Sequence, residues 1–363
     1  MQKKRGRGLT FLLFLHVRGG GQEEAKEQVS LPDRTAEDEL AQARRKTFSP
    51  ARMALQIVGF IGGVLLVVWC VRTAMAGADW AKLSGAGAGK LSALLALSVL
   101  SMVLNGWAFH VACPAVLRPD QSRPGFMALQ GVNAAATLGN FAPLRLGMLE
   151  RIAYHLRVDR LRAMQIAAWF TVMLASVLGP TAAAGIALVA GVTSPGALIL
   201  VMVIGSAVFT LMGQAICIPL QRIRGIGPLA AAVAKGPTLY KATAIRVADF
   251  LGLSLRTFIA ADIVGIALDF KGALVVSTAG GLASLGPLGR VGFREAGMAL
   301  SAQVIAGTGF EGGLDAASAQ LALVDSLGEV AVAVTFGAVA TIWLVMRVLR
   351  AGGQSRAMPA HGG

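Results

Sequence analysis

The chain has few charged residues and only three cysteines. Of its 363 residues, 14% are charged and 55% are hydrophobic, and its mean hydropathy is +0.66. Soluble globular domains carry about 25% charged residues, so this composition indicates a polytopic membrane protein instead. The cysteines Cys70, Cys113 and Cys217 allow one disulfide at most and form no C-x-x-C pair. They give no support to a disulfide framework or a zinc site, and no metal or cofactor is expected.

Acidic residues are scarce relative to basic ones. The chain has 33 Lys and Arg against 19 Asp and Glu, which gives a net charge of +14. A nucleic-acid partner is not expected, because no basic face with interleaved aromatic residues and no known binding motif is present. The basic residues lie instead at the ends of apolar runs, as the positive-inside rule describes for membrane proteins.

The chain also lacks the groupings that catalysis requires. Its four histidines are scattered, and it contains no Ser-His-Asp or Cys-His grouping and no P-loop. We therefore do not expect an enzyme.

Long apolar runs predict an all-α polytopic membrane protein with about six full transmembrane helices. They cover approximately residues 53–71, 91–111, 163–190, 197–220, 243–268 and 318–346. Basic residues at 44–46 and at Arg52 precede the first run, and Arg347 and Arg350 end the last. Both termini are therefore predicted to be cytoplasmic, in a multi-pass protein of a bacterial inner membrane.

Two shorter apolar segments, 126–142 and 272–286, are interrupted by polar and small residues. If the first crossed fully, the basic stretch 145–162 would lie outside, so the charge pattern favours a re-entrant hairpin. We expect the second hairpin to enter from the outer side, which gives an inverted-topology repeat. Its halves cover about 51–192 and 193–350.

The segments outside this transmembrane domain are polar. Residues 1–50 form a predicted disordered cytoplasmic tail, and its translation is an open question. Residues 351–363 form a short cytoplasmic tail.

A weak internal repeat joins the two hairpins. With one gap, a Pro…Arg-x-Gly-x-x-Glu pattern occurs twice, about 144 residues apart. The matched pairs are Pro143 and Pro287, Arg145 and Arg290, Gly147 and Gly292, and Glu150 and Glu295. Charges beside apolar runs are costly in lipid, at about 2.5–3.5 kcal/mol each, and mark functional candidates. The alternative is a structural turn, in which glycine permits the backbone and Arg pairs with Glu.

These stretches resemble two signatures of the lysylphosphatidylglycerol synthase transmembrane-region family, also called flippase-like proteins. The first is P-x-R-x-G-x-x-x-R, ending at Arg151, and the second lies around Val291-Gly-Phe-Arg-Glu-Ala296. The resemblance covers roughly residues 50–350. Met148 departs from it, because the family usually has Glu there, and so does Leu288, which replaces a Gly. The synthases join such a membrane module to a soluble aminoacyltransferase domain, and because the sequence stops soon after the last predicted span, we expect no synthase activity.

The resemblance implies the handling of membrane lipids. We expect the protein to bind and flip a lipid or lipid-linked headgroup across the inner membrane. An anionic headgroup is expected, and phospholipid, hopanoid and polyprenyl-linked lipids all remain open. The alternative is a non-catalytic accessory protein for a lipid-biosynthetic enzyme. The weakest alternative is an intramembrane transferase. Homo-oligomerisation is also open.

Guanidinium groups bind phosphate in bidentate fashion, so the arginines of the two motifs are the predicted headgroup ligands. The substrate-binding candidates are Arg145, Glu150, Arg151, Arg290, Arg294, Glu295, Asn133 and Asn140. The candidate coupling residues are Asp325, Glu329, Asp249 and Arg256, and of these Asp325 and Glu329, at i,i+4 on one helix face, are candidates for coupling lipid movement to proton binding. For Asp325 and Glu329 the alternative, cation partners for nearby arginines, has at least equal weight. Arg246 and Asp249 are spaced to pair at i,i+3 on one helix face.

Overall fold

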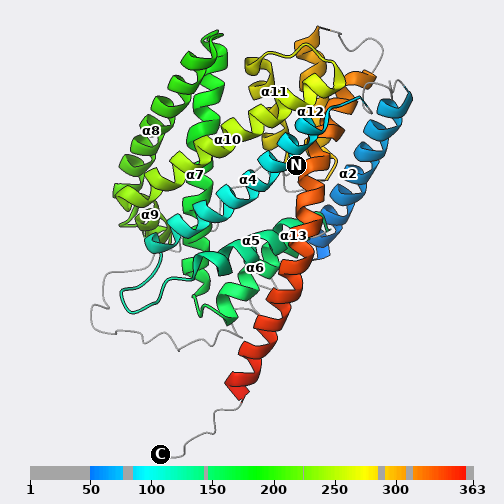
Figure 1. The fold of residues 1–363 in the computed structure, drawn as a ribbon. Coiled ribbons are helices and arrows are strands. Elements are labelled where there is room, and N and C mark those ends of the chain that lie inside the picture. Colours follow the sequence, from blue (N-terminus) through cyan, green and yellow to red (C-terminus); the bar gives the residue numbers. More distant parts are fainter. Residues whose placement is uncertain are drawn as a thin grey trace, which may run out of the picture.

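The computed structural model describes residues 50–76, 85–142, 146–223, 225–284, 291–307 and 314–356, and every regular element in these ranges is helical (Figure 1). The helices are α2 (Pro50–Ala76), α4 (Ala88–Ala112), η1 (Cys113–Ala115), α5 (Phe126–Gly139), α6 (Leu146–Arg157), α7 (Ala163–Val189), α8 (Pro195–Leu220), α9 (Gly227–Ala234), α10 (Gly236–Val264), α11 (Phe270–Ser284), α12 (Phe293–Ala306) and α13 (Ala316–Arg356). The predicted all-helical class is confirmed.

Five of these helices are long and apolar enough to cross a membrane, and they correspond to five of the six predicted spans. They lie within α2, α4, α7, α8 and α13. The remaining predicted span corresponds to α10. That helix has 29 residues, about 44 Å at 1.5 Å per residue, but it carries the charged residues Lys241, Arg246, Asp249, Arg256 and Asp262. Five spans are thus supported by length and composition. The full count of spans stays a prediction.

The segments predicted as hairpins, 126–142 and 272–286, each form a single short helix, α5 and α11, and the returning arm of each hairpin is the helix that follows the predicted segment: α5 packs against α6, and α11 against α12. These four helices have 12 to 15 residues and are about 18–23 Å long. A bilayer core is about 30 Å thick, so none of them crosses it alone. Figure 1 shows α11 and α12 near the upper end of the bundle and α5 and α6 near the lower part. Membrane entry from opposite sides stays a prediction.

Two extensive helix contacts join the N-terminal and C-terminal parts of the bundle. α4 packs along α10, so that the second and the fifth of the predicted spans lie against each other. α13 packs against α5, α2 and α12, so that it links the first hairpin to the second (Figure 1). The close packing of α4, α10 and α13 surrounds the polar centre described below.

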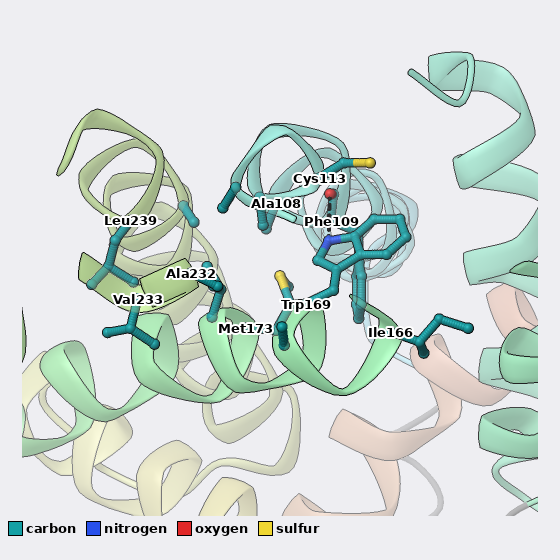
Figure 2. Close-up of a cluster of buried hydrophobic side chains, with 14 of the residues drawn as sticks. Ala108, Phe109, Cys113, Ile166, Trp169, Met173, Ala232, Val233 and Leu239 are labelled. Atoms are coloured by element: carbon teal, nitrogen blue, oxygen red, sulfur yellow. Dashed lines mark hydrogen bonds between the residues drawn. The ribbon is translucent and has the colours of Figure 1, made fainter. Parts of the chain in front are cut away.

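The largest apolar cluster lies where α4, α7, α9 and α10 meet, and its centre is Trp169 on α7 (Figure 2). The indole of Trp169 is 1% exposed, and its Nε1 donates to the backbone oxygen of Phe109 at 3.0 Å. The Phe109 ring meets the indole edge to face, with centroids 5.8 Å apart. Because the buried indole N–H has a partner, this aromatic pair holds α4 against α7 without an unsatisfied donor.

The outer faces of α2 and α8 are apolar and exposed. Leu65 on α2 and Leu200 on α8 are among many large aliphatic side chains there that no other part of the described chain covers. Such continuous apolar faces fit contact with lipid tails. The apolar composition of the chain is thus displayed on the outer faces of α2 and α8.

Parts of the predicted organisation lie outside the described residues. They are most of the tail 1–50, the tail from residue 357 onward, and the segments 143–145 and 285–290, which include Pro143, Arg145, Pro287 and Arg290.

Candidate functional site

A cavity of about 260 Å³, lined by charged, polar and apolar side chains, lies between the helices of the bundle. Its lining comes from α4, α5, α7, α10, α11, α12 and α13, including both hairpins. The charged lining residues are Arg246, Asp249, Arg256, Arg294 and Glu329. We call this space the main cavity. Charged groups surrounded by lipid-exposed helices are tolerated when they face protein or a water-filled cavity, and here they face both.

One side of the main cavity is built on Asp325 of α13, whose side chain is fully buried. Arg256 of α10 donates two hydrogen bonds to the Asp325 carboxylate, from Nε at 3.1 Å and from Nη2 at 2.9 Å. Arg294 of α12 donates to the same carboxylate. Thr257 adds a further hydrogen bond at 3.1 Å. Because both lone-pair sides of the carboxylate are used and two cations surround it, the buried charge is well compensated.

Two more carboxylates complete this cluster. Glu329 lies 3.5 Å from Arg294 and 3.7 Å from Arg256, one turn after Asp325 on α13. Glu295 accepts from the backbone N–H of Gly292 at 2.8 Å and from the hydroxyl of Ser326 at 2.8 Å. Glu295 therefore caps the start of α12, where a carboxylate complements the positive helix end. Among the described residues, two arginines and three carboxylates form this cluster, with a formal charge of −1.

A second network crosses from α10 to α4 and on to the first hairpin. Arg246 donates to Asp249 at 3.1 Å and to Asn105 at 2.6 Å, while Ser101 donates to Asp249 at 2.6 Å. The Nε of Arg246 is buried and has no hydrogen-bond partner among the described residues. A buried donor without a partner costs about 1–3 kcal/mol, and a hydrogen-bond acceptor that reached this Nε would recover part of that cost.

The network continues through two asparagines. The amide of Asn105 donates to Asn133 Oδ1 at 2.6 Å, and Asn133 Oδ1 also accepts from Arg151 on α6 at 2.8 Å. Asn133 in turn donates to the backbone oxygen of Met102 at 2.9 Å. The hydrogen bonds thus link α10, α4, α5 and α6 in one chain of polar groups.

Next to the main cavity lies a second space of about 270 Å³, which we call the side chamber. It is lined by Ala136, Asn140, Gly147, Met148, Arg151, Phe170 and Ser284. Ser284 also lines the main cavity, so the two spaces adjoin at the end of α11.

The structure brings together most of the predicted site residues that it describes. The i,i+3 pair Arg246–Asp249 is confirmed. Asp325 pairs with Arg256 and Arg294, in the geometry expected of a cation partner. Glu150 lies beside Gly139 with a buried Oε2 that has no partner among the described residues. Arg145 and Arg290 lie outside the described residues.

Sequence reasoning missed the neutral members of the two networks. Ser98, Ser101, Asn105 and Ser326 make hydrogen bonds to the charged groups. A polar residue in a long apolar run is the available signal, and Asn105 gives it most clearly. Serines give almost none, because in a helix they can bond their own backbone, as Ser98 does to Leu94.

No family model, curated protein or solved structure matches the chain. The three cysteines are free, and within the described residues no cluster of His, Cys, Asp and Glu could hold a metal ion. The charges of the site allow it to bind a polar, charged group.

Proposed function

We propose that this protein moves a lipid across the membrane, with the headgroup passing through the main cavity and the acyl chains remaining in the bilayer. The observation that carries the proposal is the main cavity itself, because five charged side chains face one space within a bundle of apolar helices. Buried charge of this kind is costly, and membrane proteins retain it mainly along substrate paths.

The two hairpins support the proposal. In transporters built as inverted repeats, substrate sites lie near the bilayer midplane at broken helices. Here the end of α5 and the end of α11 line adjoining spaces, and the helices that follow them supply Arg151 and Arg294. We propose that the hairpins are re-entrant from opposite sides, and that the chain resembles flippase-like proteins in function as well as in its two signatures.

The charges indicate where an anionic headgroup would bind. Among the described residues, the Asp325 cluster has one more carboxylate than it has cations. In the described part of the network that joins Arg246 to Arg151, Asp249 is the carboxylate in ion-pair contact, so cations are in excess there. A headgroup phosphate is therefore better stabilised at the Arg246 end than at the Arg294 end.

Lipid movement in proteoliposomes tests this proposal. We would compare fluorescent phosphatidylglycerol and phosphatidylcholine in the wild type and in the double variant Arg246→Gln/Asp249→Asn, which removes both charges of a cavity ion pair. The double variant avoids an unpaired buried carboxylate. We expect phosphatidylglycerol movement to slow by about tenfold or more, because about 1.4 kcal/mol of headgroup stabilisation corresponds to that factor.

The matched control is Lys90→Gln/Asp262→Asn, which removes an exposed ion pair of 2.7 Å between α4 and α10, outside the lining of the main cavity. This variant is expected to keep the wild-type rate. If folded wild-type protein moves no lipid in an anionic, zwitterionic and glycolipid panel, the proposal is wrong. The accessory-protein alternative then becomes the better one.

A further inference from the structure

The side chamber contains polar groups that the ion pairs of the main cavity do not use. Asn140 and Ser284 line it from the ends of α5 and α11, and Arg151 lines it from α6. The first turn of α6 also lines it, at Gly147 and Met148. The side chains of Asn140, Arg151 and Ser284 can donate hydrogen bonds. None of the lining side chains is a carboxylate.

Arg151 is a buried cation without an ion-pair partner in the described part of the chain. It is 8% exposed, and its Nη2 donates a hydrogen bond to Asn133 Oδ1 at 2.8 Å. Its guanidinium carbon lies 3.9 Å from the centre of the Phe109 ring. A guanidinium has five N–H donors, so this environment leaves donors available toward the chamber. A buried charge without a counter-ion is strongly unfavourable, and a bound anion would relieve that cost.

The start of α6 adds a second source of positive potential. α6 has 12 residues and begins at Leu146, and its first N–H groups lack intrahelical acceptors. Helix N-termini stabilise anions through these N–H groups and the helix dipole. Gly147 sits at the close contact between α6 and α5, since a Cβ there would overlap the backbone oxygen of Ala136. The N-terminus of α6 is thereby fixed at the chamber wall.

Neighbouring titratable groups do not cancel this positive potential. Glu150 is adjacent on α6 but does not line the chamber, and burial raises its pKa, which favours the neutral acid. Burial, and next the charge of Arg246, lower the pKa of Arg151 to about 9, so that Arg151 is still charged at neutral pH. Asp249 pairs with Arg246 rather than with Arg151.

We propose that the side chamber is an anion-binding station for the phosphate group of a lipid headgroup, with Arg151 as its principal ligand and the first turn of α6 and Asn140 as supporting donors. The proposal rests on the lipid-moving function above and names the part of the substrate that is recognised. The volume of about 270 Å³ accommodates a headgroup fragment rather than a whole lipid, since sites for small ligands span about 300–1,000 Å³. Ser284 marks the passage from the station to the main cavity.

Equilibrium binding separates this station from the transport proposal. The probes are dioctanoyl phosphatidylglycerol, inorganic phosphate and dioctanoylglycerol, which lacks phosphate, titrated into the full chain in an uncharged detergent. Wild-type protein should bind the phosphatidylglycerol saturably and the dioctanoylglycerol far more weakly. Arg151→Gln should weaken binding of the phosphatidylglycerol about tenfold or more, and Arg151→Lys should restore part of it, because charge is kept and the planar fork is lost.

Two further variants make the test independent of the folding of the Arg151 variants. Met148→Glu places a carboxylate at a lining residue that is 43% exposed, and should weaken binding as Arg151→Gln does. Arg157→Gln removes an exposed charge from the same helix and should leave binding unchanged.

Each remaining outcome has a distinct meaning. Equal binding by wild type, Arg151→Gln and Met148→Glu would overturn the station. Arg151-dependent binding of inorganic phosphate without binding of phosphatidylglycerol would overturn the lipid assignment and favour free phosphate. Arg151-dependent lipid binding without lipid movement in proteoliposomes would refute the transport proposal alone. Lipid movement without Arg151-dependent binding would refute the station alone.

Discussion

Asp325 has no exposed surface and holds two arginines from two other helices. The carboxylate and the two guanidinium groups each offset the cost of burying the other charge. Their ion pairs contribute little net stability, but removing one of these groups leaves a buried charge uncompensated and is strongly destabilising. The main cavity therefore depends for its integrity on a residue that does not itself line it.

Asp325→Asn should destabilise the protein by about 3–5 kcal/mol, because Arg256 and Arg294 lose their shared counter-charge. The measurement is the midpoint of thermal unfolding of purified protein in detergent. Glu329→Gln is the matched control on the same helix face. Glu329 lies 3.5 Å or more from both arginines and is partly exposed, so its loss should cost clearly less. Equal destabilisation by the two variants would contradict the conclusion that Asp325, rather than Glu329, is the main counter-charge of the two arginines.

At the scale of elements, the two hairpins depend on glycines at aligned positions. Gly147 and Gly292 occupy the same place in the repeated motif, and neither has room for a Cβ. At Gly292 the φ angle is +79° and the neighbour is the backbone of Gly63 on α2. At Gly147 the neighbour is Ala136 of the partner helix α5. The repeated glycine therefore marks a close backbone approach in both motifs, to α5 within the first hairpin and to α2 outside the second.

Gly147→Ala should destabilise the α5–α6 hairpin by about 1–3 kcal/mol, since the added methyl must displace the backbone of α5. Gly89→Ala is the control, because a Cβ at Gly89 in α4 meets nothing within 4 Å. Protease resistance of the hairpin and the thermal midpoint measure the effect. A Gly147→Ala protein as stable as Gly89→Ala would show that α6 moves away from α5 without cost.

The sequence predicts interactions within a helix much better than those between helices. The Arg246–Asp249 pair follows from helical periodicity alone, and the structure contains it. The pairing of Arg256 with Asp325 spans 69 residues, and periodicity assigns a helix face but not the helix that covers it. The shared motif located the two hairpins, whereas Asn105 and Ser101, which complete the Arg246 network, lie outside any repeat.

In the whole molecule, an inverted-topology repeat requires the two hairpins to enter the membrane from opposite sides. Single cysteines in a cysteine-free background test this, with Ser122→Cys before α5 and Ala267→Cys before α11, both at exposed positions. An impermeant maleimide should label Ser122→Cys from the cytoplasmic side and Ala267→Cys from the other side. Labelling of both from one side would contradict the inverted repeat.

A lipid headgroup is proposed to pass through the main cavity and the side chamber. The most direct test measures phosphatidylglycerol movement in proteoliposomes that contain the Ser284→Trp variant, whose indole should block the passage between the two spaces. Leu200→Trp, on the exposed apolar face of α8, is the matched control for adding an indole. We predict that Ser284→Trp abolishes movement while Leu200→Trp keeps the wild-type rate. Wild-type movement by a folded Ser284→Trp protein would contradict the account.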